Sequence, residues 1–287
     1  METNYTEEML SRLQQIELTI LKDFDDLCQK NNLSYFLCGG SAIGAVRHGG
    51  FIPWDDDIDV GMSRNDYDRF LEIASTEYAD TYKIMNNISN PDFPLMNTRW
   101  GLNGTKFVPL DFKNVKGDFG IFLDIFCFDN IPDDENMMKK QATRAWFWGK
   151  LLVLSGVSDP VIYVYGWKAK VMKFVLKIAH YVLRILHLKP RFFYKRAATY
   201  MLKYKNASTQ RMAYMFDPQR YTSIILKSDI YPVKRMKFED IEVSVPAKIE
   251  AYLSHRYGNY MKLPPEDKRH NHPPYILDFG RYGDKEN

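Results

Sequence analysis

Four aspartates, Asp55, Asp56, Asp57 and Asp59, lie in the stretch GGSAIGAVRHGGFIPWDDDIDVGM, residues 39–62. Side chains of a strand alternate between its two faces, so a strand over residues 56–62 would point Asp57 and Asp59 the same way. Adjacent carboxylates repel each other and raise each other's pKa unless a cation compensates them. Carboxylate ligands without a nearby cysteine favour Mg²⁺ or Mn²⁺. We therefore expect Asp57 and Asp59 to hold a divalent metal.

A solvated turn is the alternative interpretation, because aspartate is common in turns. Two features of the context favour the metal. Ile58 and Val60 alternate with the acids, and Gly39-Gly40-Ser41 stands one short segment upstream. A glycine turn at the start of a helix exposes backbone N–H groups that can hold a phosphate. A phosphate cradle beside a carboxylate metal site is what metal-assisted phosphoryl transfer requires.

Asp124 is the candidate third ligand. It lies in the apolar run GIFLDIF, residues 120–126, which predicts a second strand. A single carboxylate among Ile, Phe and Leu is costly unless it has a charged partner. A role for Asp124 as a loop cap is the alternative.

Local patterns predict the elements that position these acids. Apolar residues recur at helical spacing over residues 6–30. Ser41 is placed to cap a helix that ends near Arg47, and Ser63 with Asp66 resembles a capping box that opens a helix to about residue 78. Strands are expected at residues 34–38, 56–62, 95–100, 105–109 and 120–126. The last of these should stop at Asp129-Asn130 and Pro132.

Residues 135–205 have helical patterns, broken near residues 155–160 and at Pro190. A strand over residues 241–246 and a short helix over about 247–257 follow. These elements predict an α+β fold in which helices flank a mixed sheet. The predicted parts are a catalytic core at 1–134, a helical basic insertion at 135–215 and a segment at 216–287 that returns to the core.

Composition excludes several classes of protein. The chain has 287 residues, 45% of them hydrophobic, enough for one large domain or one domain with a sizeable insertion. Its three cysteines show no C-x-x-C spacing, which argues against a disulfide framework or zinc ribbon and fits a reducing compartment. His270 and His272 have no further ligand at zinc-site spacing. The polar N-terminus and the lack of a long apolar run predict no signal peptide and no spanning helix. We expect a cytoplasmic protein without a nucleic-acid partner.

A basic segment occupies the middle of the chain. From Pro160 to Phe216 there is no Asp or Glu, while Lys and Arg number 12. The polar residues of its helical pattern are spaced three and four apart and form one stripe: Lys170, Lys173, Lys177, His180, Arg184, His187 and Arg191. A basic stripe beside a wide apolar face suits peripheral contact with an anionic membrane. The alternative is that the apolar face packs on the core and leaves the lysines in water.

The aspartate motif also carries a resemblance to a known family. The run LCGGSAIGAVRHGGFIPWDDDIDVGM, YDRF at residues 67–70, FLDIF around Asp124 and YGNYMKLPPEDKRHNH at residues 257–272 resemble the LicD/fukutin-related family. The resemblance covers residues 31–130 well and the C-terminal residues moderately. Many relatives have a lysine two residues before Arg99, where this chain has Asn97.

The resemblance implies a nucleotidyltransferase-like fold, of the polymerase-beta type, and a transferase. Such an enzyme moves a phosphorylated alcohol from a CDP-linked donor to a sugar hydroxyl of a cell-surface glycan and releases CMP. Phosphocholine from CDP-choline is the first expectation, as in lipopolysaccharide biosynthesis, whereas animal relatives use CDP-ribitol. The acceptor glycan is often tethered to a membrane, which would place this protein at the inner face of one.

The resemblance and the motif assign roles to ten residues. Donor phosphate would be held by Gly39, Gly40 and Ser41, and the metal by Asp57, Asp59 and Asp124, of which Asp124 can also take the hydroxyl proton. Further substrate contacts are expected from Arg47, His48, Trp54 and Arg99. Helix C-terminal capping is the alternative for Arg47 and His48. For Trp54 and Trp100 the choice is between a choline contact and the core.

Two other functions remain open. A nucleotidyltransferase would transfer the nucleoside phosphate itself and release pyrophosphate instead of CMP. A non-enzymatic metal-binding protein at a membrane would bind the cation without turnover.

Overall fold

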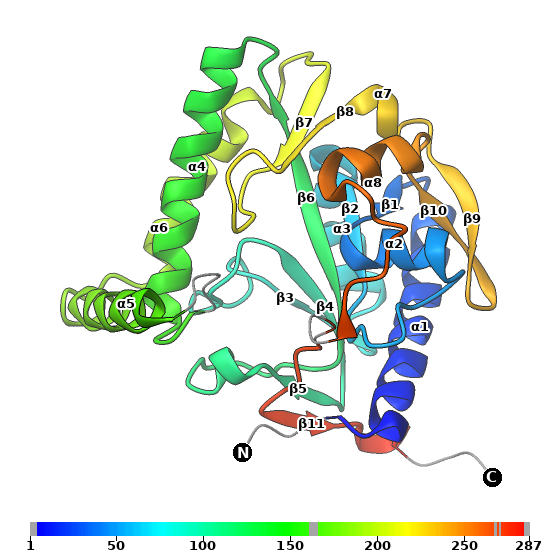
Figure 1. The fold of residues 1–287 in the computed structure, drawn as a ribbon, viewed down its shortest axis with the longest axis horizontal. Coiled ribbons are helices and arrows are strands. Elements are labelled where there is room, and N and C mark those ends of the chain that lie inside the picture. The colour runs from blue at the N-terminus through cyan, green and yellow to red at the C-terminus, as the bar shows by residue number, and fades with distance from the viewer. Residues whose placement is uncertain (1–4, 161–165, 267–268, 270, 284–287) are drawn as a thin grey trace.

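Strands from distant parts of the chain meet around one long central strand, β6 (Figure 1). The computed structural model describes residues 5–160, 166–266, 269 and 271–283, so His270 lies outside the described residues. The α-helices are α1 (Glu7–Lys30), α2 (Gly39–Arg47), α3 (Arg64–Glu77), α4 (Glu135–Gly156), α5 (Trp167–Ile185), α6 (Pro190–Met201), α7 (Lys227–Ile230) and α8 (Ile249–Tyr257). Short 3-10 turns are η1 (Leu110–Phe112), η2 (Leu202–Tyr204) and η4 (Gly280–Tyr282).

The strands form one large sheet and two separate two-stranded sheets. They are β1 (Tyr35–Leu37), β2 (Asp59–Ser63), β3 (Tyr82–Met85), β4 (Thr98–Leu102), β5 (Lys106–Val108), β6 (Phe122–Ile131), β7 (Arg211–Tyr214), β8 (Ser223–Leu226), β9 (Lys234–Phe238), β10 (Ile241–Val245) and β11 (Ile276–Asp278). The two-stranded sheets pair β9 with β10 and β5 with β11. The path of the large sheet is β1-β2-β6-β4-β3, with β7 and β8 added at the C-terminal end of β6. β2 runs parallel to β6 and β4 runs antiparallel to it, so the sheet is mixed. The predicted α+β class, a mixed sheet flanked by helices, is confirmed.

The first helix forms as its pattern predicts. The Thr6 side chain caps α1 by accepting a hydrogen bond from the backbone N–H of Met9 at 3.1 Å. Glu7 and Glu8 in the first turn and Lys30 in the last complement the helix dipole.

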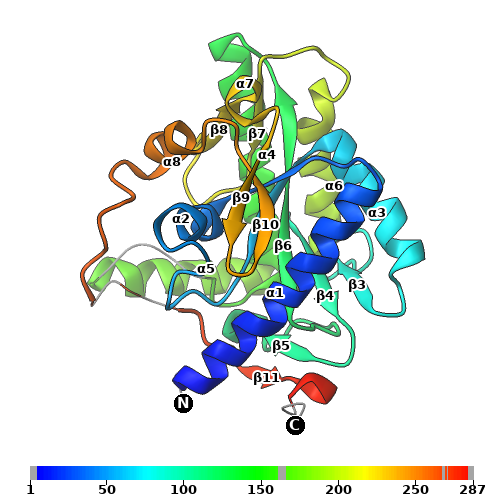
Figure 2. The same ribbon diagram turned by 90° about the vertical axis from the view of Figure 1, so that its right-hand side faces the viewer.

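The two faces of the sheet have different covers. α1 and α3 lie on one face, and α1 crosses in front of the sheet in Figure 2. On the other face Phe36 of β1 packs against Phe128 of β6 and Tyr252 of α8. Strand alternation explains the division, because neighbouring residues of one strand point to opposite faces.

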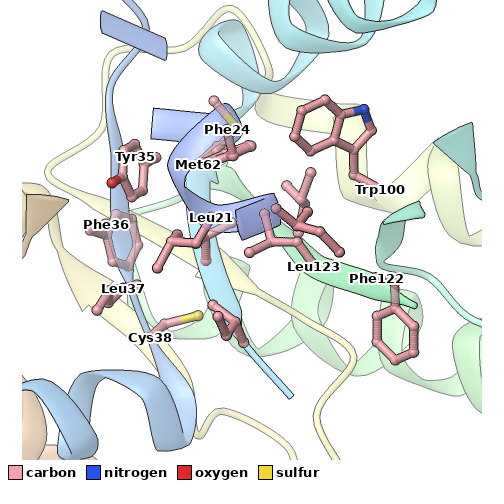
Figure 3. Close-up of a cluster of buried hydrophobic side chains, with 14 of the residues drawn as sticks. Leu21, Phe24, Tyr35, Phe36, Leu37, Cys38, Met62, Trp100, Phe122 and Leu123 are labelled. Carbon is pink, nitrogen blue, oxygen red and sulfur yellow. The ribbon is translucent and has the colours of Figure 1, made fainter. Parts of the chain in front are cut away.

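Trp100 is the centre of the core under α1 (Figure 3). Its ring stacks on Tyr82 with 3.9 Å between centroids and lies within 6.0 Å of Phe24, Phe70 and Tyr78. The side chain is fully buried. A ligand contact for Trp100 is therefore wrong, and its role is in the core.

Several strand boundaries differ from the prediction, and β4, for example, covers Thr98–Leu102 instead of residues 95–100. β2 begins at Asp59 rather than Asp56. β6 continues through Asp129-Asn130 instead of stopping there, because Arg64 pairs with Asp129 at 2.8 Å and Asn130 donates to two backbone carbonyls. A polar pair that has partners from elsewhere in the chain does not end a strand.

Other local predictions have mixed outcomes. The Ser63–Asp66 cap of α3 and the short strands near residues 35–37 and 241–245 are confirmed. The predicted Ser41 cap is wrong, because α2 begins at Gly39 with Cys38 as its N-cap. The prediction missed β3, β7, β8, β9 and β11, which have three to five residues each and pair with strands elsewhere in the chain.

The helical prediction for the middle of the chain is confirmed, including the break before Pro190, which starts α6. α4 and α6 pack side by side, and a small apolar cluster joins α4 to β6 and β7. β7 follows α4, α5 and α6 in the chain, yet it pairs with β6, which precedes these helices. Within the described ranges, none of the helices combines the length and the apolar character needed to cross a bilayer.

We expect Trp100→Ala to lower the free energy of unfolding by about 3–5 kcal/mol, because the side chain is fully buried among four rings. Trp167→Ala is the matched control, since that tryptophan is 72% exposed, and its effect should stay within about 0.5 kcal/mol. Urea unfolding measures both. Equal unfolding midpoints for the two variants would contradict this description of the core.

Candidate functional site

Three charged residues stand in a row across the sheet. Asp59 of β2 lies opposite Asp124 of β6, and Arg99 of β4 lies opposite Asp124 on the other side. Residues opposite each other in neighbouring strands point to the same face. This is the face away from α1, because the adjacent Trp100 packs under that helix. The strand register thus brings two acids and one base together.

Asp57 joins this row although it precedes β2. Carboxylate oxygens of Asp57, Asp59 and Asp124 all lie within 4.8 Å of one another. Asp59 is anchored through its backbone, since its N–H donates to Ser41 Oγ at 2.8 Å and its carbonyl accepts from the Cys38 N–H. The structure therefore brings the three predicted metal ligands together and gives Ser41 a contact with one of them.

Asp124 has the charged partner that its burial requires. Its Oδ1 accepts hydrogen bonds from Asn97 Nδ2 at 2.5 Å and from Arg99 Nε at 3.3 Å. The Arg99 guanidinium lies 3.8 Å from the Phe122 ring centroid, and its Nη1 is buried with no hydrogen-bond partner in the described structure. Asn97 thus contacts Asp124 directly. Arg99 retains an N–H group that is free for a ligand oxygen.

The charge of the cluster is only partly compensated. Enclosure by protein, followed by the charges of the neighbouring carboxylates, raises the pKa of Asp57 and Asp59 well above the ordinary value, although both are half-buried by exposed area. Burial also raises the pKa of Asp55 to about 6. For Asp124, burial raises the pKa while Arg99 and Asn97 oppose the shift. Three converging oxygen donors with excess negative charge fit Mg²⁺ or Mn²⁺.

The glycine pair lies directly against the aspartates. Gly39 has φ +58°, and a Cβ at this position would lie 2.0 Å from Asp59 Oδ2. A Cβ on Gly40 would lie 2.5 Å from Asp55 Oδ2. Glycine is therefore needed for the close approach of two carboxylates to the start of α2. The predicted phosphate cradle and the predicted metal ligands therefore lie next to each other at the start of α2.

Arg47, His48 and Trp54 form a separate group at the end of α2. Arg47 donates to the Tyr260 carbonyl at 2.7 Å and to His48 at 3.0 Å, and the His48 ring lies 6.5 Å from that of Trp54. The Arg269 guanidinium lies 5.0 Å from the Trp54 ring. Arg47 and Trp54 thus contact the C-terminal segment, and His48 lies between these two residues. Arg47 also interacts electrostatically with Asp55.

Glu17 belongs to the site, and sequence analysis missed it. It lies on the buried stripe of α1, is 1% exposed, and its Oε2 has no partner among the described residues. Burial raises its pKa well above the ordinary value, and the charges of Asp57, Asp56 and Asp55 add to the effect. The sequence did contain a signal for Glu17, because an acidic residue on the apolar stripe of an amphipathic helix is unusual.

Residues of the C-terminal segment close the site, and of these Arg256 was missed by sequence analysis. The backbone N–H of His272 donates to buried Asp56 at 2.8 Å. Arg256 pairs with Asp217 at 3.2 Å and borders a small cavity beside Asp59. No local pattern marks Arg256, because Asp59 lies far from it in the sequence, whereas His272 belongs to the C-terminal motif at residues 257–272.

The chain is similar to known proteins in the region that contains the carboxylate cluster. Residues 32–150 match the family model described as LicD/FKTN/FKRP, nucleotidyltransferase domain. The chain is 28% identical, over 93% of its length and 98% of the relative's, to the lipopolysaccharide cholinephosphotransferase LicD of Haemophilus influenzae. The chain therefore carries a segment that matches the LicD/FKTN/FKRP family model, and it is similar to a LicD protein along nearly its whole length.

Two further relatives match only a short segment of the chain. The human and mouse proteins named ribitol 5-phosphate transferase FKRP are each 44% identical over 43 residues, which is 15% of this chain and 9% of theirs. The LicD family model includes the three carboxylates and Arg99, whereas Glu17, Arg256 and His272 lie outside its span.

We expect Asp57→Asn and Asp59→Asn each to stabilise the metal-free protein near neutral pH and to abolish its stabilisation by Mg²⁺ or Mn²⁺. A raised pKa means that stability is full below the unfolded-state value and is lost as the pH rises through the folded-state value. Asparagine cannot ionise, so the substitution removes this loss of stability at neutral pH. The Tm without metal should therefore rise by roughly 2–4 °C.

Thermal unfolding with chelator and with added metal measures both effects. Asp80→Asn, at an exposed aspartate outside the cluster, is the control and should behave as wild type. An Asp57→Asn or Asp59→Asn protein that still gains stability from Mg²⁺ would contradict the ligand assignment.

Proposed function

We propose that this protein is a phosphotransferase that moves a phosphorylated alcohol, phosphocholine first among the candidates, from a CDP-linked donor to a sugar hydroxyl of a cell-surface glycan. One observation carries the proposal: Asp59, Asp124 and Arg99 form a row on three neighbouring strands, with Asp57 and the glycine pair beside it. Similarity along nearly the whole chain to the cholinephosphotransferase LicD supports the choice of phosphocholine.

Two kinds of group in the row would bind the diphosphate: a metal ion held by the carboxylates, and the guanidinium of Arg99. Asp57, Asp59 and Asp124 would hold Mg²⁺ or Mn²⁺, which when bound supplies positive charge against the diphosphate and the departing CMP. Arg99 would donate its unpartnered N–H group to a donor oxygen. The N-terminal end of α2 would add backbone N–H groups, as expected for a nucleotidyltransferase-like fold.

In the proposed reaction the sugar hydroxyl oxygen attacks the phosphorus that bears the alcohol. A new P–O bond forms to the sugar, the P–O bond to CMP breaks, and CMP leaves with the bonding electron pair. Asp124 would take the hydroxyl proton, because burial raises its pKa and both of its described hydrogen bonds are on Oδ1. Positioning of the hydroxyl against the phosphorus supplies the remaining rate enhancement.

The small cavity beside Asp59 is the candidate place for the transferred alcohol. Four of its lining residues are aromatic: Phe126, Phe128, Tyr214 and Tyr252. Aromatic faces bind a quaternary ammonium such as that of choline. The cavity is about 30 Å³, roughly one water molecule, so binding would require a lining side chain such as that of Arg256 to move.

The proposed donor also bears on where the protein acts. Cys28, Cys38 and Cys127 are free and buried, which supports a reducing compartment. We propose the cytoplasm, where the protein would meet its nucleotide-linked donor.

Incubation with CDP-choline, CDP-ribitol or CDP-glycerol and an acceptor glycan tests the function. The expected result is Mg²⁺-dependent release of CMP with transfer of phosphocholine. Asp59→Asn should reduce the rate by about 10²–10³-fold. Release of pyrophosphate from CTP would favour a nucleotidyltransferase instead, and metal binding without any turnover would favour a non-enzymatic protein.

We expect Arg99→Lys to lower kcat/KM for the CDP-linked donor at least tenfold, because lysine keeps the charge but loses the fork that reaches both Asp124 and a ligand oxygen. Steady-state kinetics measures the loss. Arg64→Lys is the matched control, since Arg64 forms a buried pair with Asp129 away from the cluster. That control should lower Tm and leave kcat/KM within about twofold. Equal kinetic losses in both variants would remove Arg99 from donor binding.

A further inference from the structure

α5 exposes a continuous apolar face to solvent. Trp167, Phe174 and Ile185 are 72%, 66% and 76% exposed. Further large apolar side chains on this face are also exposed: Val171, Val175, Ile178 and Val182. Their spacing of three and four residues aligns them along one side of the helix.

The opposite side of α5 faces the protein. His180 is buried there, and its Nδ1 lies 2.8 Å from the Leu154 carbonyl of α4. Leu176 and Leu183, four and three residues from His180, are half-buried. In Figure 1, α5 lies at the lower end of α4, at the edge of the molecule. The wide apolar face of this helix therefore points away from the catalytic core and does not pack on it.

Basic residues follow one flank of this apolar face. Lys170, Lys173, Lys177 and Arg184 are exposed and lie between the outward side and the buried side. Lys173 pairs with Asp159 at 3.2 Å, whereas Lys170 and Lys177 have no ion pair in the described part of the chain.

The positive flank continues into a pocket at the C-terminal end of α5. Its lining includes His180, Arg184, His187, Lys189 and Lys116. The one carboxylate in the lining, Asp92, lies 3.7 Å from Lys189. An apolar face beside a positive edge complements a surface that is apolar inside and negative at its rim.

We propose that α5 binds flat on an anionic lipid bilayer, with its apolar side in the interfacial region and its lysines among the headgroup phosphates. A second copy of this chain fits the same face less well. Residues 160–216 contain no Asp or Glu, so two such faces would bring basic stripes together without any acid from this segment between them.

The surface of α5 that we propose binds lipid is linked to the carboxylate cluster through the short segment of residues 112–116. Phe112 of η1 lies 5.2 Å from the Arg99 guanidinium, and Asn114, Val115 and Lys116 line the pocket at the end of α5. Lipid binding by α5 needs no turnover, so the proposal stands independently of the proposed reaction.

Sedimentation of the full chain with lipid vesicles tests the proposal. The wild-type protein should bind vesicles of phosphatidylcholine with phosphatidylglycerol, bind pure phosphatidylcholine vesicles far less, and lose affinity as salt is raised. Blue-shifted tryptophan emission should accompany binding and should be strongly reduced in Trp167→Phe. Binding that is equal with neutral and anionic vesicles, or absent from both, would overturn the proposal.

Two variants separate the charge from the apolar face. Combined Lys170→Glu, Lys173→Glu and Lys177→Glu should weaken binding to anionic vesicles at least tenfold. Combined Phe174→Ser, Ile178→Ser and Ile185→Ser should weaken it to a similar degree. Lys140→Glu, Lys234→Glu and Lys237→Glu together form the control, with the same charge change on exposed lysines outside the basic segment and its pocket, and should retain more than a third of the wild-type affinity.

Size-exclusion chromatography with light scattering distinguishes the rival occupant. A dimer that the serine variant converts to a monomer, combined with unchanged vesicle binding, would show that α5 pairs with a second copy and would overturn the lipid assignment. Circular dichroism confirms that each variant is folded. A monomeric wild type with salt-sensitive vesicle binding supports the proposal.

Discussion

The parallel pairing of β2 with β6 is the constraint on which the rest of the site depends. It places Asp59 opposite Asp124, and a shift of one residue would turn one carboxylate to the face under α1. Arg99 and Asn97 compensate Asp124 from the β4 side. Asp57 and Asp59 accept no hydrogen bond from a lysine or arginine in the described structure. The excess charge therefore lies toward β2, next to the glycine pair, where an incoming cation gains most.

Two buried acids on α1 have different purposes. Asp25 accepts hydrogen bonds from Arg235 at 2.6 and 2.7 Å and from Tyr35 at 2.6 Å, so it fastens α1 to the sheet and to β9. Glu17 lies two turns earlier on the same stripe, beside the aspartates and with one oxygen unpartnered. Both residues look alike in the sequence. The structure shows that Asp25 is paired with a cation, whereas Glu17 is buried near other carboxylates without one, which raises its pKa.

Local sequence patterns were sufficient to predict the elements around the aspartate motif. Helical periodicity predicted α1, the Ser63–Asp66 pattern predicted the start of α3, and an isolated Asp in an apolar run correctly required a charged partner. The prediction failed where partners come from far away. Asp129 has the composition of a strand end, yet Arg64 holds it inside β6. Arg256 and His272 reach the site across more than 190 residues, a relation that no spacing rule contains.

The contact between His272 and Asp56 joins positions 216 residues apart, and Arg12 donates to the Tyr282 carbonyl across 270. Every strand of the large sheet precedes residue 227, so the segment that covers Asp56 comes from outside the sheet. The pairing of β2 with β6 joins Asp59 and Asp124, which are only 65 residues apart. The entropy cost of closing a loop in an unfolded chain grows with the length of the loop. Bringing His272 to Asp56 therefore carries a larger loop-closure cost than forming the strand pair that aligns the two metal-binding aspartates.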